Sequence, residues 1–433
     1  MLGSLFVTIV AVACASSWSV ELRRVAQPTR LAGLVVLCVL ATWFAARRPR
    51  RPRPDPVVLL AVGAFFAIAM ASVAWSVDPT ESLVKAGAFG VLLAAAGALA
   101  FAVADDGSAA RRLLTTVVAA AVAVALVGFG IWAVSADDAL QPASAGIGAR
   151  FRGLGENPNT VAMLFAAALP LAALLTLEAR ARRGRVAGAA SLLLLMGSIA
   201  ASGSRGALAA GCVGLLLFGI AAFTRQSSRV AVAVAVALLA ALGLAARSLP
   251  EPLTPGAAKF AHSPQANTER FSVHDAQYAI RLEDEIGYPA SFHAVSSGLF
   301  SSSGRVDAWR GALEQGERRP LAGYGFGTEE AVFVDRFWGF QGGVPENSFL
   351  GLFLQLGAVG VVLFIVLFGA LLAAAVRVLR IDRNLASACL GVLGAGVVLS
   401  LVQSYLYAIG NVATLTVWIC AFLAAGRSRG RPR

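Results

Sequence analysis

Charged residues are scarce in this chain. They make up 14% of its 433 residues, whereas hydrophobic residues make up 58%, and a soluble domain carries about 25% charged residues. The mean hydropathy is +0.74. This balance excludes a soluble globular domain, and the high apolar content also excludes a disordered chain. The sequence has no short-period repeat, which excludes a fibrous protein. An all-α polytopic membrane protein is the class that remains.

Lysine is almost absent. The chain has 34 arginines but only Lys85 and Lys259, and its formal net charge is +12. In a soluble protein such an excess would indicate a nucleic-acid partner. In a membrane protein, basic residues mark the connections that face the cytoplasm. We therefore expect membrane lipids, and no nucleic acid, around this chain.

Patterns typical of metal sites and disulfides are also missing. The five cysteines all fall inside apolar runs, without a CxxC spacing or a neighbouring histidine, so neither zinc nor a disulfide framework is indicated. The only acidic run, 283–285, is interpreted as a solvated loop. We expect no metal and no cofactor.

Apolar runs long enough to cross a bilayer, which takes about 20 residues, recur along the chain. The first run lacks a basic head and a clean cleavage site, so we predict a span there and not a removed signal peptide. We predict about twelve transmembrane helices, nine within residues 1–246 and three within 348–425. Their predicted ranges are 2–20, 31–46, 57–75, 84–104, 113–134, 159–177, 187–203, 206–223, 230–246, 348–376, 385–407 and 411–425.

The distribution of basic residues orients these spans. Connections on one side hold 20 Lys and Arg, and the short connections on the other side hold 7, which predicts that the richer side is cytoplasmic. Both termini, including a basic tail at 426–433, then lie in the cytoplasm, and the predicted location is the cytoplasmic (inner) membrane. The cytoplasmic connections are 47–55, 105–112, 178–185, 224–229, 377–383 and the tail. The opposite ones are 21–30, 76–85, 135–157, 204–205 and the turn near Tyr407.

One connection is much longer than the others. Residues 247–347 form a polar extracytoplasmic loop before the tenth helix, with a net charge of −4. This loop holds all three histidines, His262, His274 and His293. We predict a folded element or lid over an outward-facing site.

Polar motifs gather at the predicted outer ends of the spans. Arg150 and Arg152 precede an Asn157-Pro158-Asn159 turn that can cap the next helix. Arg205 stands between two apolar runs, where a guanidinium needs an anionic partner and phosphate suits its fork of donors.

The second half of the chain adds a further basic group and a carboxylate. Arg305 and Trp309 have the spacing of a short helix start, and Gly323, Gly325 and Gly327 indicate a flexible turn. Glu346 lies where the loop re-enters the membrane, beside the N-terminus of the tenth span, whose dipole favours a carboxylate. Arginines suit a lipid-linked phosphate, and a carboxylate suits general-base work on a hydroxyl.

At these residues the sequence resembles the O-antigen ligase and O-antigen polymerase superfamily, whose members move glycans from polyprenyl diphosphate carriers on the outer face of the membrane. The order of the motifs, the twelve-span layout and the late outer loop all match. The matching segments are 75–79, 155–159, 202–208, 304–309, 320–327 and the entry into the tenth span. The resemblance covers about residues 57 to 425.

The family's late motif is histidine, then Asn, Ser or Gln, nine residues, and Gly-x-x-Gly. Here Asn347, Gly357 and Gly360 fill their places, but Glu346 stands where the family has histidine. The family histidine assists deprotonation of the acceptor hydroxyl. A glutamate can act as a general base, and a histidine of the long loop is an alternative.

The resemblance implies a metal-independent, inverting membrane glycosyltransferase. Its donor is a glycan on polyprenyl (undecaprenyl) diphosphate, and its acceptor is a glycan or lipid hydroxyl. The expected catalytic residues are Glu346 as the base, with Arg205 and Arg305 holding the diphosphate. The expected substrate-binding residues are Arg152, Arg150, Asn157, Asn159, Asn347 and Trp309.

Two other classes stay open at this point. One is a transporter or flippase for a lipid-linked glycan, although no ionisable residue lies in the middle of a predicted span. The other is an inactive scaffold of an envelope polysaccharide assembly, which the absence of the histidine allows. The sequence does not separate a ligase from a polymerase.

Overall fold

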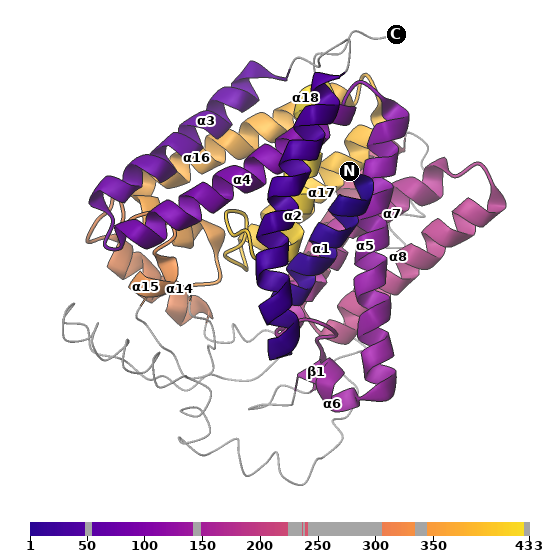
Figure 1. Cartoon of the computed structure of the whole chain (residues 1–433), viewed down its shortest axis with the longest axis horizontal. Coiled ribbons are helices and arrows are strands. Elements are labelled where there is room, and N and C mark those ends of the chain that lie inside the picture. The colour runs from indigo at the N-terminus through magenta and orange to yellow at the C-terminus, as the bar shows by residue number, and fades with distance from the viewer. Residues whose placement is uncertain are drawn as a thin grey trace.

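The computed structural model of the chain describes residues 1–47, 54–141, 149–223, 236, 239–240, 305–333 and 344–427. Within these residues it is an all-helical bundle with one very small sheet (Figure 1). Nine of the described helices are long and apolar enough to cross a membrane. Two shorter apolar helices accompany them, Leu2–Ala15 and Val412–Arg427. The class of an all-α polytopic membrane protein is confirmed.

The elements follow one another along the chain in a simple order. In the first part they are α1 (Leu2–Ala15), α2 (Val20–Ala46), α3 (Pro56–Ala71), η1 (Ser72–Trp75), α4 (Pro79–Val103), α5 (Gly107–Val134), α6 (Ala136–Ala139), β1 (Leu140–Gln141), β2 (Arg150–Phe151), α7 (Pro158–Glu178), α8 (Arg182–Ser202) and α9 (Arg205–Ala222). In the second part they are α14 (Arg305–Gly316), α15 (Glu329–Val332), α16 (Ser348–Val378), α17 (Arg383–Ser400) and α18 (Val412–Arg427). Strands β1 and β2 pair antiparallel.

Short polar residues begin most of the long helices. The side chains of Asp78, Asn157, Ser204 and Asn347 each accept a hydrogen bond from a backbone N–H of the first turn. Such caps satisfy donors that the helix itself leaves unpaired. Proline occupies the first position of α3, α4 and α7, where its fixed φ suits a helix start and its missing N–H costs nothing. Local chemistry therefore sets the start of most of the long helices.

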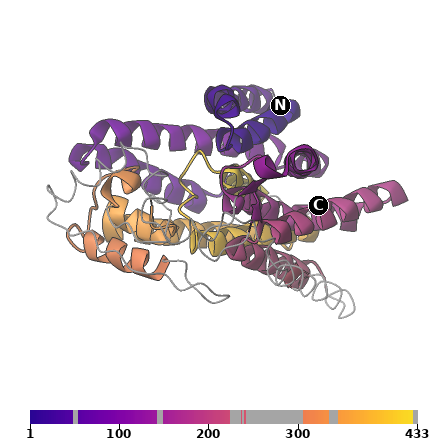
Figure 2. The ribbon, with the colours of Figure 1, turned by 90° about the horizontal axis from the view of Figure 1, so that it is seen from below.

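Small residues bring the central helices close together. Gly214 of α9 faces the Gly391 carbonyl of α17, and a Cβ on Gly214 would lie 2.9 Å from that oxygen and 3.2 Å from Pro170 Cγ of α7. Close approach at small residues is the usual way in which membrane helices associate. Helices α7, α9 and α17 pack against one another, and α18 is buried along almost its whole length. The N-terminal helices lie to one side of the bundle (Figure 2).

One end of the bundle is held by charged groups. Arg111 of α5 donates to Glu178 at the end of α7 and, at 3.4 Å, to Asp382, the cap of α17. Arg427 of α18 donates to the same Asp382 at 2.9 Å, and Arg377 pairs with Asp55. These residues come from connections that the sequence assigns to one side, so the predicted alternation brings them to one end of the molecule.

Two predicted boundaries are wrong. Residues 21–30 are not a connection: α2 begins at Val20 and includes them, with Ser19 as its cap. The predicted span 385–407 is too long, because α17 ends at Ser400 and residues 401–411 form a loop before α18. Both errors arise because hydropathy reports which residues are apolar and not where backbone hydrogen bonding stops.

Several predictions fall on residues outside the described part of the chain. These are most of the ninth span 230–246, residues 48–53 of the basic connection, the tail from 428, and the loop segments 247–304 and 334–343 with the three histidines and the 283–285 acidic run. The count of twelve spans stays a prediction. Of the long loop, the described residues contain α14 and α15, which both contact α16.

Candidate functional site

Arg305 and Glu346 form an ion pair. The Nε and Nη2 atoms of Arg305 both donate to Oε2 of Glu346, at 2.9 and 2.6 Å. The two side chains are 22% and 15% exposed. Arg305 begins α14 and Glu346 immediately precedes the cap of α16, so residues 41 positions apart meet at the start of the tenth predicted span. Within the described part of the chain, the hydrogen bonds of this pair use Arg305 Nε and Nη2 and Glu346 Oε2.

The backbone around Glu346 is held in an unusual conformation. Glu346 has a φ of 49° and is the one non-glycine residue with positive φ in the described chain. Such a conformation costs free energy and persists where the surroundings fix it. The indole of Trp309 supplies one of these constraints, because its Nε1 donates to the Pro345 carbonyl at 2.8 Å. Trp309 thus holds the segment that carries Glu346.

Asn347, which follows Glu346, joins the start of α16 to a neighbouring loop. Its Oδ1 caps α16 by accepting from the N–H groups of Phe349 and Leu350. Its Nδ2 donates to the Leu401 carbonyl at 3.1 Å. Asn347 therefore joins the start of α16 to the loop 401–411, a connection inside what the sequence predicted to be a continuous span.

The same loop reaches the start of α9. A Cβ on Gly206 would lie 2.6 Å from Val402 Cγ2, so the residue after Arg205 lies against the residue that follows Leu401. The N-termini of α9 and α16, each carrying a partial positive charge, consequently meet the same short stretch of backbone. Arg205 is half-buried there. The structure therefore brings the segments of Arg205, Arg305 and Glu346 to one region.

Arg150 and Asn159 form a separate group. Arg150 Nη2 donates to Asn159 Oδ1 at 2.6 Å, and its Nε donates to the Ser202 carbonyl at 2.8 Å. Ser202 is the last residue of α8, and Gly203 follows with a φ of 60°. Arg150 thus stabilises the turn that leads into Ser204 and Arg205. In these contacts Arg150 and Asn159 orient the Arg205 segment.

Arg152 and Asn157 have mainly local contacts. Arg152 donates to the carbonyls of Asp138 and Asp137, and its guanidinium lies 5.5 Å from the ring centroid of Trp18. Burial lowers the pKa of Arg152. Asn157 caps α7 through the N–H of Asn159 at 2.8 Å. Both residues hold the loop between β2 and α7 in shape.

A glycine-rich segment is inserted into a break in α16. Gly357 has φ 60° and ψ −160°, which interrupts the helix. The N–H groups of Tyr324 and Gly325 donate to the carbonyls of Leu354 and Gln355, at 2.9 and 2.8 Å. In the other direction, Ala358 N donates to the Pro320 carbonyl at 2.7 Å. The inserted segment satisfies backbone groups that the break frees.

The glycines of this segment are required by close approach. Gly323, Gly325 and Gly327 have φ values of 65°, 110° and 85°. A Cβ on Gly323 would overlap the backbone of Gln355. The expectation of a flexible turn is wrong, because each glycine is held by hydrogen bonds or by packing against other elements.

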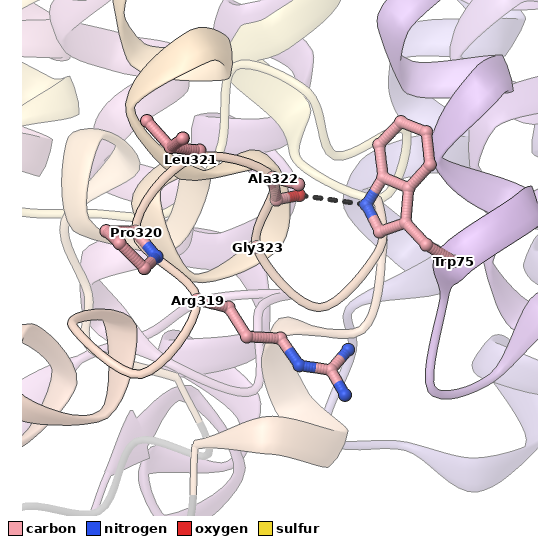
Figure 3. Close-up of a pocket in the computed structure, with 6 residues that line it drawn as sticks. All are labelled: Trp75, Arg319, Pro320, Leu321, Ala322 and Gly323. Carbon is pink, nitrogen blue, oxygen red and sulfur yellow. Dashed lines mark hydrogen bonds between the residues drawn. The ribbon is translucent and has the colours of Figure 1, made fainter.

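A shallow pocket of about 360 Å³ lies beside the inserted segment. The indole Nε1 of Trp75 donates to the Ala322 carbonyl at 2.9 Å, and Arg319 extends along the other side of the pocket (Figure 3). The lining is formed by Trp75 and residues 319–323. The Trp75 motif is thus joined to the glycine-rich motif 247 positions later in the chain.

A second carboxylate, that of Glu329, is buried near the start of α16. Glu329 of α15 is 5% exposed and accepts hydrogen bonds from Ser404 Oγ at 2.5 Å, Tyr407 OH at 2.8 Å and Gln355 Nε2 at 3.0 Å. Burial raises the pKa of Glu329 to about 7, although the hydroxyls of Ser404 and Tyr407 oppose this shift. Burial likewise raises the pKa of Tyr407 well above its ordinary value, so its hydroxyl stays a donor.

Sequence reasoning missed Glu329 and its donors. Glu329 stands next to Glu330 in a polar loop, a pattern typical of a solvated surface. Ser404 and Tyr407 lay inside or at the end of a predicted span. The one available signal was their polarity within an apolar run.

The described residues contain no group of three or more His, Cys, Asp or Glu side chains that could hold a metal ion. The arrangement offers arginines and helix N-termini for an anion, and a partly exposed carboxylate for a proton.

Comparison with known proteins relates part of the chain to a family. Residues 189–365 match the family model described as O-antigen ligase. This part of the chain is similar to the O-antigen ligase family. It includes Arg205, Arg305, Glu329 and Glu346, although the match covers less than half of the chain. A search among curated proteins found no match.

The match of residues 189–365 supports a membrane protein that processes glycans, with a glycosyltransferase-like activity and lipid-linked glycan substrates. The helices described above place this region within a membrane bundle.

Proposed function

We propose that the chain is a metal-independent, inverting glycosyltransferase that uses a polyprenyl diphosphate-linked glycan as donor. The observation that carries the proposal is the Arg305–Glu346 pair at the start of α16, close to the start of α9. It combines a carboxylate, fixed by two donors, with cationic groups that suit a diphosphate. The family of residues 189–365 supports the same reaction class.

In the proposed reaction, Glu346 Oε1 accepts the proton of the acceptor hydroxyl. The hydroxyl oxygen then attacks C1 of the donor sugar, the bond from C1 to the phosphate oxygen breaks, and C1 inverts. The electron pair of that bond leaves with the polyprenyl diphosphate. Arg305 and Arg205 stabilise the leaving diphosphate, whose negative charge grows as the bond breaks.

The remaining predicted residues support this centre. Trp309 and Asn347 hold the segment around Glu346, and Arg150 and Asn159 hold the turn before Arg205. We propose that Arg152 and Asn157 shape the neighbouring loop that the glycan passes. The site faces the extracytoplasmic side of the cytoplasmic membrane, with both termini in the cytoplasm, as the charge distribution predicts.

The test is complementation of a deletion strain with Arg205→Ala, Arg305→Ala and Glu346→Gln at matched membrane levels. We expect each variant to lower glycan transfer by roughly 100-fold, the usual effect of removing a preorganised electrostatic group. Lipid-linked glycan should accumulate in its place. Near-normal product from both arginine variants would contradict the proposal.

The same strains distinguish the functions that the sequence left open. Glycan that is long but unattached in the deletion strain identifies a ligase, and short chains identify a polymerase. A loss of glycan translocation, restored by Glu346→Gln, would identify a flippase.

A further inference from the structure

Glu329 collects hydrogen bonds from parts of the chain that are far apart in sequence. Gln355 belongs to the first half of α16, whereas Ser404 and Tyr407 belong to the loop between α17 and α18. The carboxylate lies against α16 at Gly351, where a Cβ would overlap both Glu329 and Tyr407. Three segments therefore meet at one acidic side chain.

Ser404 extends this contact to the proposed site. Its Oγ donates to Glu329 Oε1 and also accepts from the backbone N–H of Asn347 at 3.2 Å. Asn347 directly follows Glu346. One continuous path, Glu329 to Ser404 to the Asn347 amide, thus ends at the peptide bond that joins Glu346 to Asn347.

Neighbouring contacts hold the same turn in place. Ser348 Oγ donates to the Gln403 carbonyl at 2.7 Å and accepts from Tyr405 N at 3.2 Å. The loop 401–411 therefore touches the start of α16 at two consecutive residues. The position of the loop and the position of Glu346 are linked.

The chemistry of a carboxylate explains why an acid stands at this position. An ionised carboxylate only accepts hydrogen bonds, so it turns the Ser404 hydroxyl proton toward itself. The lone pairs of Ser404 Oγ are then directed away from Glu329 and toward the Asn347 N–H. A buried charge without such donors would be costly, and here three donors offset part of that cost.

We propose that Glu329 is a positioning residue that fixes Glu346 through Ser404 and the backbone of Asn347. This inference rests on the proposed function, because it assigns Glu346 as the base. Glu329 does not contact the acceptor itself: it is buried behind α16 and its oxygens are occupied by protein donors, whereas Glu346 is partly exposed.

The experiment measures transfer in membranes that carry Glu329→Ala, Glu329→Gln or Ser404→Ala. The donor probe is the polyprenyl diphosphate-linked glycan extracted from the deletion strain. We expect Glu329→Ala and Ser404→Ala to lower kcat by about tenfold to 100-fold with KM changed by less than about threefold, since small displacements of a catalytic group cost this much. Glu329→Gln keeps an acceptor oxygen and should recover at least half of the lost kcat.

A double variant tests whether Glu329 and Ser404 act through the same contacts. Because Glu329 and Ser404 act along one path, the combined Glu329→Ala and Ser404→Ala variant should lose no more kcat than either single variant. Glu330→Gln is the matched control, since it removes an exposed carboxylate one residue away and should leave kcat unchanged.

The results that would contradict the positioning role of Glu329 differ from those that would contradict the proposed function. A full kcat in Glu329→Ala, or a raised KM with normal kcat, would overturn the positioning role alone, provided that Glu346→Gln shows its expected loss of transfer. An active Glu346→Gln would instead overturn the proposed function and the positioning role together. If Glu329→Ala does not reach the membrane, Ser404→Ala and the glutamine variant give the same comparison with smaller structural change.

Discussion

At the scale of single residues, the region contains two carboxylates with opposite surroundings. Glu346 is partly exposed and paired with an arginine, whereas Glu329 is buried and bound by neutral donors. Burial opposes the ionisation of Glu329, which its hydroxyl donors favour. One position is thus suited to receive a proton from a ligand and the other to hold its neighbours.

The raised pKa of Glu329 predicts a pH dependence of stability. Its ordinary value is 4.5 and the folded value is about 7, so folding takes up a proton between these values. The free energy of unfolding should then fall as pH rises from about 4.5 to 7, by up to about 3 kcal/mol, and level off above that range. The groups that face Glu329 are Lys85, Glu330 and Tyr407.

Thermal unfolding of the detergent-solubilised protein between pH 5 and 8 measures this effect. Glu329→Gln should flatten the fall in Tm, and Glu330→Gln should leave most of it in place. An equal fall in both variants would assign the pH dependence to other groups.

At the scale of elements, α16 is two helical segments joined by an interruption that another segment fills. Gly357 makes the interruption, and residues 320–325 occupy it. The sequence predicted the span correctly because its apolar run is continuous. It could not predict the break, because Gly357 lies among several glycines of the same run and only tertiary contacts distinguish it.

Replacing Gly357 tests this interpretation. Gly357→Ala should lower Tm and transfer together, because its backbone conformation costs about 1–3 kcal/mol for a side chain and its Cβ would overlap the Leu321 carbonyl. Gly369→Ala in the same helix is the matched control. Its Cβ would meet no atom within 4 Å, so Tm should stay level or rise slightly. Equal effects of the two substitutions would contradict the role of the break.

The loop 401–411 shows the same limit of sequence reasoning. Residues 385–407 are apolar enough to be taken as one span, yet Asn347, Ser348 and Glu329 all bind the loop that interrupts them. Arg205, Arg305 and Glu346 were found from motif spacing and charge. Glu329, Ser404 and Tyr407 were not, because their importance depends on contacts between distant segments.

At the scale of the whole molecule, the two ends of the bundle are built differently. One end carries the ion pairs among Arg111, Glu178, Asp382 and Arg427, and the other carries the glycine-rich segment, the Arg305–Glu346 pair and the starts of α9 and α16. The positive-inside prediction assigns the first end to the cytoplasm.

Thiol labelling tests this orientation. In a variant with the native cysteines replaced by alanine, Asp105→Cys should react with a membrane-impermeant maleimide only after permeabilisation. Glu156→Cys should react in intact cells. Both positions are exposed, so access and not burial decides the outcome. Reversed labelling would place the proposed site in the cytoplasm.

The interruption of α16 also has a consequence for the order of synthesis. Residues 320–325 leave the ribosome before the helix that they complete, because they precede Ser348 in the chain. When α16 enters the bilayer, the segment that hydrogen-bonds its unpaired amides and carbonyls has already been made. The helix can therefore enter the bilayer without first exposing unpaired backbone amides and carbonyls to hydrocarbon. Each such unsatisfied group would cost several kcal/mol.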